Sequence, residues 1–149
     1  MNKMDRSEAI RKTAALIQGI KIAMLTTHSG QRLHSRPMAT QQADFKGDLW
    51  FLSRAESGEV DEIEHGAMVN LTYVNSDSHA YVSLSGRAEL TRDRAKIEEL
   101  WKPTHYAWFP LGKDDPEIMV IKVIVEEAEY WEAPGNVLVR SYQLLKAVV

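Results

Sequence analysis

The stretch His34-Ser35-Arg36-Pro37-Met38 has the composition of an unusual β-strand, because it carries a cation, a proline and small polar groups where a core strand would be apolar. Alternation along residues 33–40 gives neither face of this strand a uniform character. Proline donates no hydrogen bond to a sheet, so Pro37 predicts an edge strand, a bulge or the point at which the strand leaves its neighbour. Arg36 then either offers forked donors to an anionic or planar ligand or is a solvated arginine on an edge strand.

The composition bounds the class of protein. The chain has 149 residues and no cysteine, which excludes a disulfide framework, thiol catalysis and cysteine-ligated zinc. Residues 1–12 are charged, no long apolar run follows them, and no stretch reaches membrane-spanning length. The net charge of -3, with both signs mixed along the chain, argues against a general nucleic-acid-binding surface. We therefore expect a single domain over residues 1–149 that is soluble and cytoplasmic, with neither a membrane nor a nucleic acid as its partner.

Helix and strand patterns alternate along the chain. Asp5 and Glu8 form a capping pair for a helix at about 5–18. Two further short helices are expected, one capped by Ser57 and one opened by Thr91. Apolar and aromatic runs separated by polar turns predict strands at 20–27, 32–43, 49–52, 69–74, 81–90 and from 118 onward. The tail, 137–149, fits either a short strand or a helix.

The strand that begins at 118 changes its pattern partway. Every second residue along 119–125 is apolar, but beyond that point the same parity holds two glutamates. A bulge or a strong bend near Glu126 would reconcile the two halves. About six strands and three or four short helices fit a mainly β fold, a small and partly open antiparallel barrel with peripheral helices.

The sequence contains no common catalytic or metal-binding pattern. It has no HxxxH or HExxH spacing, no GxSxG elbow, no Walker loop and no GxGxxG fingerprint. No metal site is predicted, and the histidines are expected to be mostly surface residues; they are His28, His34, His65, His79 and His105. No residue stands out as a catalytic acid or base, so the catalytic residues are unknown.

Two loop features leave alternatives open. Trp108 lies in the aromatic and proline-rich loop 103–116, where it either covers a flat ligand or packs on a second subunit. Ser57 and Gly58 open a helix, so the free N–H groups there either bind a phosphate or are simply capped by the serine. Glu59 in the first turn stabilises the helix but repels an arriving phosphate.

Four motifs in order along the chain carry a family resemblance. They are His34-Ser35-Arg36-Pro37-Met38, Leu49-Trp50-Phe51-Leu52 with Ser57 downstream, Ala107-Trp108-Phe109-Pro110 before Asp114-Asp115-Pro116, and Glu129-Tyr130-Trp131. Over residues 20–134 the chain resembles the general-stress-protein branch of the pyridoxamine-phosphate-oxidase-like FMN-binding split barrels. The resemblance implies a six-stranded antiparallel split β-barrel that forms a homodimer, with FMN in a groove at the subunit interface.

The resemblance also implies which residues contact the cofactor. Those expected at the flavin ring, the ribityl chain or the phosphate are Arg36, Pro37, Met38, Phe51, Leu52, Ser57, Gly58, Tyr81, Trp108 and Trp131. Phe51 and Leu52 would flank the ring together. Ser57 and the Gly58 backbone would face the phosphate, and Trp108 would reach the site from the partner subunit.

Two departures from the family qualify its function. The family usually has a phosphate-binding lysine where this chain has Glu59, which reverses the sign of the interaction with a phosphate. The vitamin-synthesising oxidases carry a substrate-binding Arg-x-His that residues 142–149 lack, so pyridoxamine phosphate oxidation is not expected. The resemblance implies an FMN-dependent oxidoreductase linked to the general stress response, with an unknown small-molecule substrate and reductant. The alternative is a non-catalytic flavin- or small-ligand-binding stress protein in which FMN binding is weakened or lost.

Overall fold

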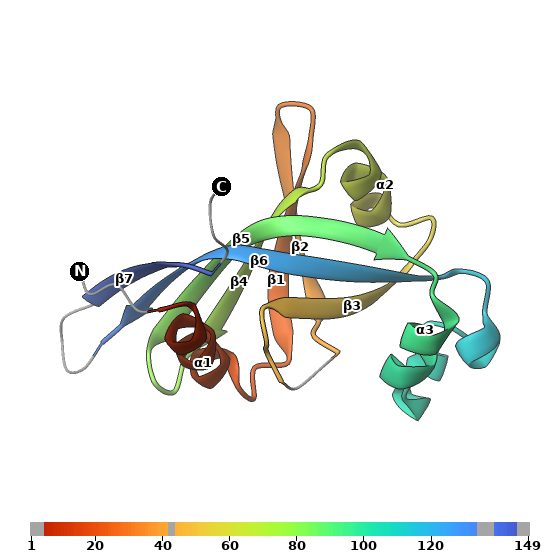
Figure 1. Ribbon diagram of the computed structural model, residues 1–149. Helices are drawn as coiled ribbons and strands as arrows, with labels where there is room; N and C mark the ends of the chain where they lie inside the picture. The colour runs from red at the N-terminus through yellow and green to blue at the C-terminus, as the bar shows by residue number, and fades with distance from the viewer. Residues whose placement is uncertain (1–4, 42–43, 134–138, 146–149) are drawn as a thin grey trace.

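The computed structural model describes residues 5–41, 44–133 and 139–145 (Figure 1). Its elements in chain order are α1 (Arg6–Ile17), β1 (Ile22–Ser29), β2 (Arg32–Ala39), β3 (Asp48–Arg54), α2 (Gly58–His65), β4 (Met68–Asn75), β5 (Ala80–Thr91), α3 (Arg94–Leu100), the 3-10 turns η1 (Pro103–Ala107) and η2 (Gly112–Asp114), β6 (Ile118–Glu132) and β7 (Val139–Leu144). The described strands pair antiparallel throughout, which confirms the mainly β class with peripheral helices. The described sheet has seven strands rather than the expected six, because the tail forms β7 and not a helix.

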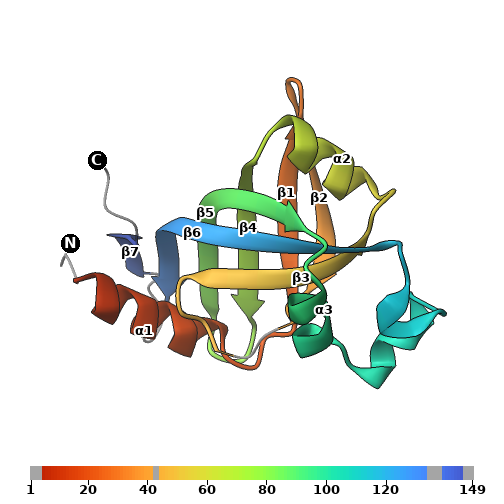
Figure 2. The ribbon, with the colours of Figure 1, turned by 45° about the vertical axis from the view of Figure 1, so that its right-hand side comes forward.

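The order of the strands leaves the barrel open along one line. The sheet runs β2-β1-β4-β5-β6-β3, and β7 pairs with the second half of β6 (Figure 2). The two ends of this path, β2 and β3, border the opening, which we call the seam. Pro37 therefore lies on an edge strand, as its missing N–H predicts. β2 ends at Ala39 rather than near residue 43, and residues 42–43 lie outside the described part of the chain.

The bulge expected near Glu126 is confirmed. The pairing of β5 with β6 passes over Glu126, which lies between the partners of Ser85 and Gly86. Beyond the bulge, Ala128 and Tyr130 are buried, so the burial pattern of β6 continues with its parity changed. The extra residue thus lets one long strand bend around the core while keeping apolar side chains inside.

Short polar side chains cap the helices. Asp5 caps α1 and Ser57 caps α2. The third helix is capped by Asp93 and not by Thr91, because Thr91 is still paired in the sheet as the last residue of β5. Within the described part of the chain, no helix is both long enough and apolar enough to cross a bilayer.

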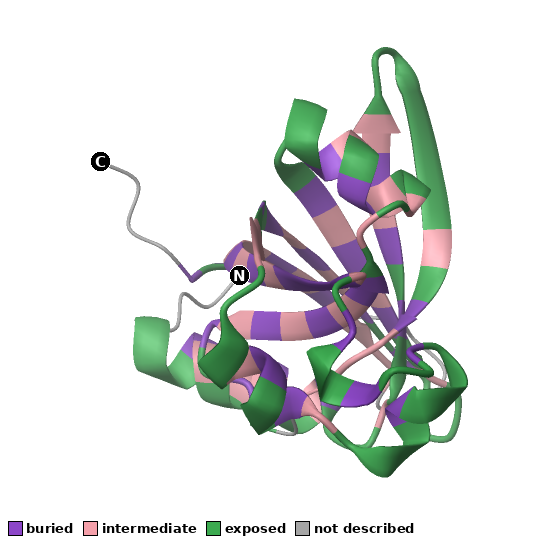
Figure 3. Cartoon of the chain, turned by 90° about the vertical axis from the view of Figure 1, so that its right-hand side faces the viewer, coloured by how far each residue is buried: buried purple, intermediate pink, exposed green. Residues whose placement is uncertain are grey.

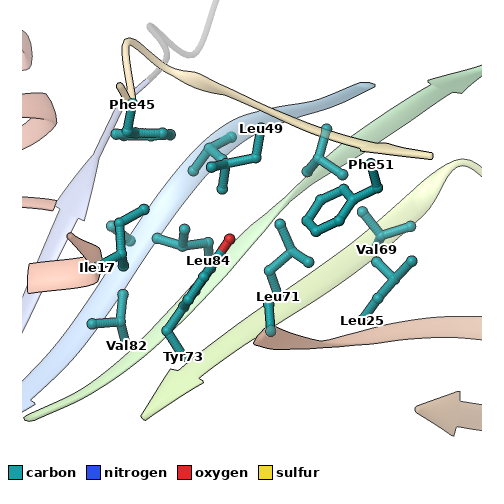
Figure 4. Close-up of a cluster of buried hydrophobic side chains, with 14 of the residues drawn as sticks. Ile17, Leu25, Phe45, Leu49, Phe51, Val69, Leu71, Tyr73, Val82 and Leu84 are labelled. Atoms are coloured by element: carbon teal, nitrogen blue, oxygen red, sulfur yellow. The ribbon is translucent and has the colours of Figure 1, made fainter. Parts of the chain in front are cut away.

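Apolar side chains pack on both faces of β3. Buried residues gather along the inner side of the sheet (Figure 3). In this main core, Phe51 lies near Leu25, Val69 and Leu71 (Figure 4). A second cluster covers the outer face of β3, and its buried members are Ile97, Leu100, Phe109, Ile118 and Val120. Since both faces are covered, the run of large residues along 49–52 shows no alternation of apolar and polar side chains.

Candidate functional site

A cavity opens at the seam and extends to the segment that follows α3. Its volume of about 560 Å³ is within the range of small-molecule sites, about 300–1,000 Å³. Its apolar wall consists of Ile22, Pro37, Met38, Ala39, Leu52, Trp108 and Phe109. Polar groups are gathered at the end nearest the start of α2, where Ser53, Ser57 and Glu59 lie.

Five of the ten predicted cofactor contacts line this cavity. They are Pro37, Met38, Leu52, Ser57 and Trp108. They come from three regions far apart in the sequence, which are β2, β3 with the start of α2, and the loop after α3. The fold therefore brings half of the predicted set to one place, at the opening between the two edge strands.

Phe51 and Leu52 do not face the same side of β3. The Phe51 side chain is fully buried in the main core (Figure 4), whereas Leu52 lines the cavity from the other face of the strand. Side chains alternate along a strand, so only one residue of such a pair can point toward a ligand. The Phe51 side chain therefore faces the core and not this cavity, and the contact between Phe51 and a bound ring stays a prediction.

Trp108 lines the cavity of its own chain. It lies there without a second copy of the chain, and the expectation that it reaches a site from a partner subunit stays a prediction. The Arg54 Nη1–H group donates a hydrogen bond to the Trp108 carbonyl oxygen at 2.7 Å, which fixes the loop to the end of β3. The Trp108 side chain is nevertheless 60% exposed, so it provides a large aromatic surface at the mouth of the cavity.

Arg36 lies beside the cavity but is already engaged by the protein. It faces α2 and is not a solvated edge residue: its Nη1–H donates to Thr27 Oγ1 at 2.6 Å. Its Nη2 atom is 3.6 Å from Glu62 Oε2, and its Nε atom is 4.0 Å from Glu59 Oε2. The guanidinium charge is therefore shared between two carboxylates.

Glu62 holds this network together under α2. It accepts hydrogen bonds from Thr27 Oγ1 at 2.5 Å and from His34 Nδ1 at 2.7 Å. These hydrogen bonds, first that from Thr27 and then that from His34, hold the pKa of Glu62 below its usual value of 4.5, and the charges of His34 and Arg36 act in the same direction. Glu62 is thus kept as a carboxylate, and it ties β1 and β2 to the helix.

The wall suits a flat aromatic ring better than a phosphate. Within the described wall, the charged side chains are one cation, Arg54, and two carboxylates, Glu56 and Glu59. A negative unit charge placed about 4 Å from an unpaired carboxylate costs on the order of 4 kcal/mol at an effective dielectric constant of 20, before salt screening. Arg36, 4.0 Å from Glu59, offsets part of this repulsion at Glu59. The residues present therefore fit the ring system of a flavin and do not fit the phosphate of FMN. Gly58, exposed at the start of α2, lies outside the described lining.

His105 is a cavity residue that the sequence did not single out. It is 5% exposed, and its Nδ1 accepts a hydrogen bond from the Lys102 N–H at 2.9 Å, so the proton of the neutral ring is on Nε2. Burial lowers the pKa of His105, and the charge of Lys102 adds to this effect. Within the described part of the chain the Nε2–H has no acceptor, so it is available to a ligand. A second cavity, of about 970 Å³, shares His105 and Trp108 with the first.

Tyr81 and Trp131 lie elsewhere. They are cross-strand partners on β5 and β6, and neither is among the described residues that line the cavity. Trp131 lies eleven residues beyond Val120, the β6 partner of Leu52, which corresponds to roughly 35 Å along the strand. The fold therefore does not bring these two predicted contacts to the cavity of the same chain.

The strand order and the cavity together define a split β-barrel with a cavity at its seam. The family described as "Pyridoxamine 5'-phosphate oxidase like" matches residues 8–149, and the chain belongs to this family.

Three known proteins illustrate the similarity. Protein bli-3 of Neurospora crassa is 27% identical over 153 residues, which cover 95% of this chain and 73% of that protein. General stress protein 26 of Bacillus subtilis is 22% identical, with 87% of this chain and 93% of that protein covered. The crystal structure of the general stress FMN/FAD binding protein of Xanthomonas citri has a TM-score of 0.75 at 23% identity, covering 96% of this chain and 99% of that chain. At that identity the likeness shows the fold alone.

Proposed function

We propose that the seam cavity binds the ring system of a flavin and that the protein acts as a flavin-dependent oxidoreductase. The observation that carries this proposal is the mostly apolar cavity bounded by Pro37, Leu52 and Trp108 at the open edge of the barrel. Flat ligands are held by such walls together with a few well-placed polar groups. Membership of the family, and the FMN/FAD binding named for the Xanthomonas citri protein, support a flavin as the flat ligand.

The protein groups would bind and orient the ring. Trp108 and Pro37 would exclude water from its faces, and the free Nε2–H of His105 would donate a hydrogen bond to an acceptor on its edge. A bound flavin would supply the electron transfer. The small-molecule substrate and the physiological reductant would approach the open side of the seam.

A homodimer is the second part of the proposal. Strand pairing puts Met24, Val74 and Tyr81 on one outer face of the sheet, and their exposed fractions are 40%, 49% and 39%. Pro37 and Trp131 lie on this same face, Pro37 on β2 at the cavity and Trp131 on β6, several strands away. In a two-fold dimer this face would meet its own copy, so the tyrosine and the tryptophan of each copy would be directed toward the other copy.

The dimer can be tested by changing the charge of this face. Val74→Glu would place a carboxylate in the proposed interface and should give a monomer in sedimentation velocity. Leu111→Glu is the control, because Leu111 is 71% exposed and lies in the segment after α3, outside the strands that form this face. A monomeric wild type, or a Val74→Glu protein that is still a dimer, would contradict the proposed interface.

A non-catalytic ligand-binding role is the second candidate function. It is favoured by the polar end of the cavity, where Ser53 and Arg36 are already engaged by Glu59 and its neighbours. Such a protein would bind a flavin or another flat ligand without turning it over. Anaerobic reduction of the flavin-loaded protein by NADH or NADPH separates the two functions, because a carrier would leave the bound flavin oxidised.

Flavin binding itself is tested by titration. We expect saturable quenching of flavin fluorescence on addition of the purified protein, and at least tenfold weaker binding by Trp108→Ala. Tyr106→Ala is the matched control, because Tyr106 is an aromatic residue of the same segment that is 55% exposed and is not among the described lining residues. Absence of saturable binding to the wild type, or equal losses in the two variants, would refute the proposed site.

A further inference from the structure

Glu59 is the end point of a chain of hydroxyl donors at the polar end of the seam cavity. The Ser53 hydroxyl donates a hydrogen bond to Glu59 Oε1 at 2.7 Å. Ser53 Oγ also lies 2.9 Å from Ser57 Oγ. A serine hydroxyl carries one proton, so the proton in this second hydrogen bond comes from Ser57. Both serine protons are therefore used within the network that ends at Glu59, and neither is offered to an arriving phosphate.

The adjacent guanidinium is engaged in the same way. Arg36 is within 4.0 Å of Glu59 and within 3.6 Å of Glu62, and it donates to Thr27 at 2.6 Å. Its side chain is 20% exposed, and that of Glu59 is 16% exposed. An anionic ligand group could therefore pair with Arg36 only by displacing the Glu59 carboxylate, which already has hydrogen-bond and charge partners in the protein.

The chemistry that complements this end of the cavity is neutral and rich in O–H donors. Carboxylates accept hydrogen bonds from hydroxyl groups and repel other anions. A phosphate monoester carries a charge of about -1.5 to -2 at pH 7. Riboflavin has the same ring as FMN, but its tail ends in a hydroxyl group and carries no charge.

We propose that Glu59 makes the seam cavity selective for a non-phosphorylated flavin, whose polyol tail donates hydrogen bonds to the Glu59 carboxylate. This inference rests on the proposed flavin binding and names the class of flavin. Riboflavin binds at least tenfold more tightly than FMN at low ionic strength. Added salt narrows this ratio, because it screens the repulsion between the carboxylates and the phosphate.

The test compares riboflavin and FMN on the full-length protein after removal of any copurified flavin. Glu59→Gln keeps the size of the side chain and removes its charge, so it brings the two dissociation constants to within about threefold of each other. Glu59→Lys reverses the preference in favour of FMN. Glu64→Lys is the control, because it makes the same charge change at an exposed position of α2 outside the described cavity wall and leaves the wild-type ratio within twofold.

The possible failures are distinguishable. Equal or tighter binding of FMN by the wild type overturns the selectivity and leaves flavin binding in place. Saturable binding of neither flavin overturns the proposed function together with this inference. An unchanged ratio in Glu59→Gln overturns the role of Glu59, and this variant decides the question alone if Glu59→Lys does not fold.

Discussion

Gly86 lies in β5 beside the bulge of β6. Replacing it by alanine would press a methyl group against the backbone of β6. A Cβ atom at this position would lie 2.0 Å from the carbonyl oxygen of Ile124 and 3.0 Å from the Cα of Val125. Ordinary contact begins at 3.4 Å, so the two strands would have to separate locally by about 1.4 Å. The atoms in the way belong to the backbone of a paired strand, so no flexible side chain can move aside.

The cost follows from this geometry. Overpacking a core usually costs about 1–3 kcal/mol, and each ladder hydrogen bond lost near the bulge adds roughly 1 kcal/mol. We expect Gly86→Ala to lower the free energy of unfolding by about 3 kcal/mol or more. For a domain of this size that corresponds to a fall in Tm of roughly 6–12 °C.

Urea denaturation at one fixed protein concentration, followed by circular dichroism, measures the effect. Gly58→Ala is the matched control, because a Cβ there meets nothing within 4 Å and the residue is the first of α2. Its unfolding free energy should stay the same or rise by up to about 1 kcal/mol. A loss below 1 kcal/mol in Gly86→Ala, or equal losses in the two variants, would refute the bulge geometry.

Three further predictions concern buried groups. The lowered pKa of Glu62 stabilises the fold above pH 4.5, and this contribution is lost as the pH falls through the lowered value. Glu62→Gln should therefore reduce the slope of the free energy of unfolding against pH on the acid side, and an unchanged slope would contradict the network around Arg36. Burial raises the pKa of Tyr73 to about 12, so its tyrosinate should form only near that pH in an ultraviolet titration, and Tyr73→Phe should remove this step. The stabilising effect of the raised Tyr73 pKa is present below pH 10 and is lost as the pH rises through the folded-state value. Phe51→Ala should cost about 3–5 kcal/mol of stability, whereas Leu52→Ala should mainly weaken flavin binding; the opposite pattern would mean that the two side chains face the other way.

The features predicted correctly from the sequence are those that depend on local rules. The bulge at Glu126 follows from a change of parity along one strand, and the edge position of β2 follows from the missing N–H of Pro37. Ser57 is a favourable helix cap, and it occupies that position. Each of these depends on residues close together in the chain.

The features that were missed depend on long-range packing. Phe51 and Leu52 could not be told apart because apolar clusters cover both faces of β3. His105 is buried because the loop folds onto Trp101, and the ring centroids of these two residues are 5.3 Å apart. The local signal for His105 was its place three residues after Lys102, from which a side chain can reach back to the first N–H of a helical turn. The sequence marked Glu59 as unusual, but its partners Ser53 and Arg36 come from two different strands.

A crystal structure of the protein with riboflavin tests the central claim most directly. The account predicts the flavin ring in the seam cavity between Pro37, Leu52 and Trp108, with the polyol tail directed toward Glu59. A ring bound elsewhere, for example against the Tyr81–Trp131 pair with the seam cavity empty, would contradict it.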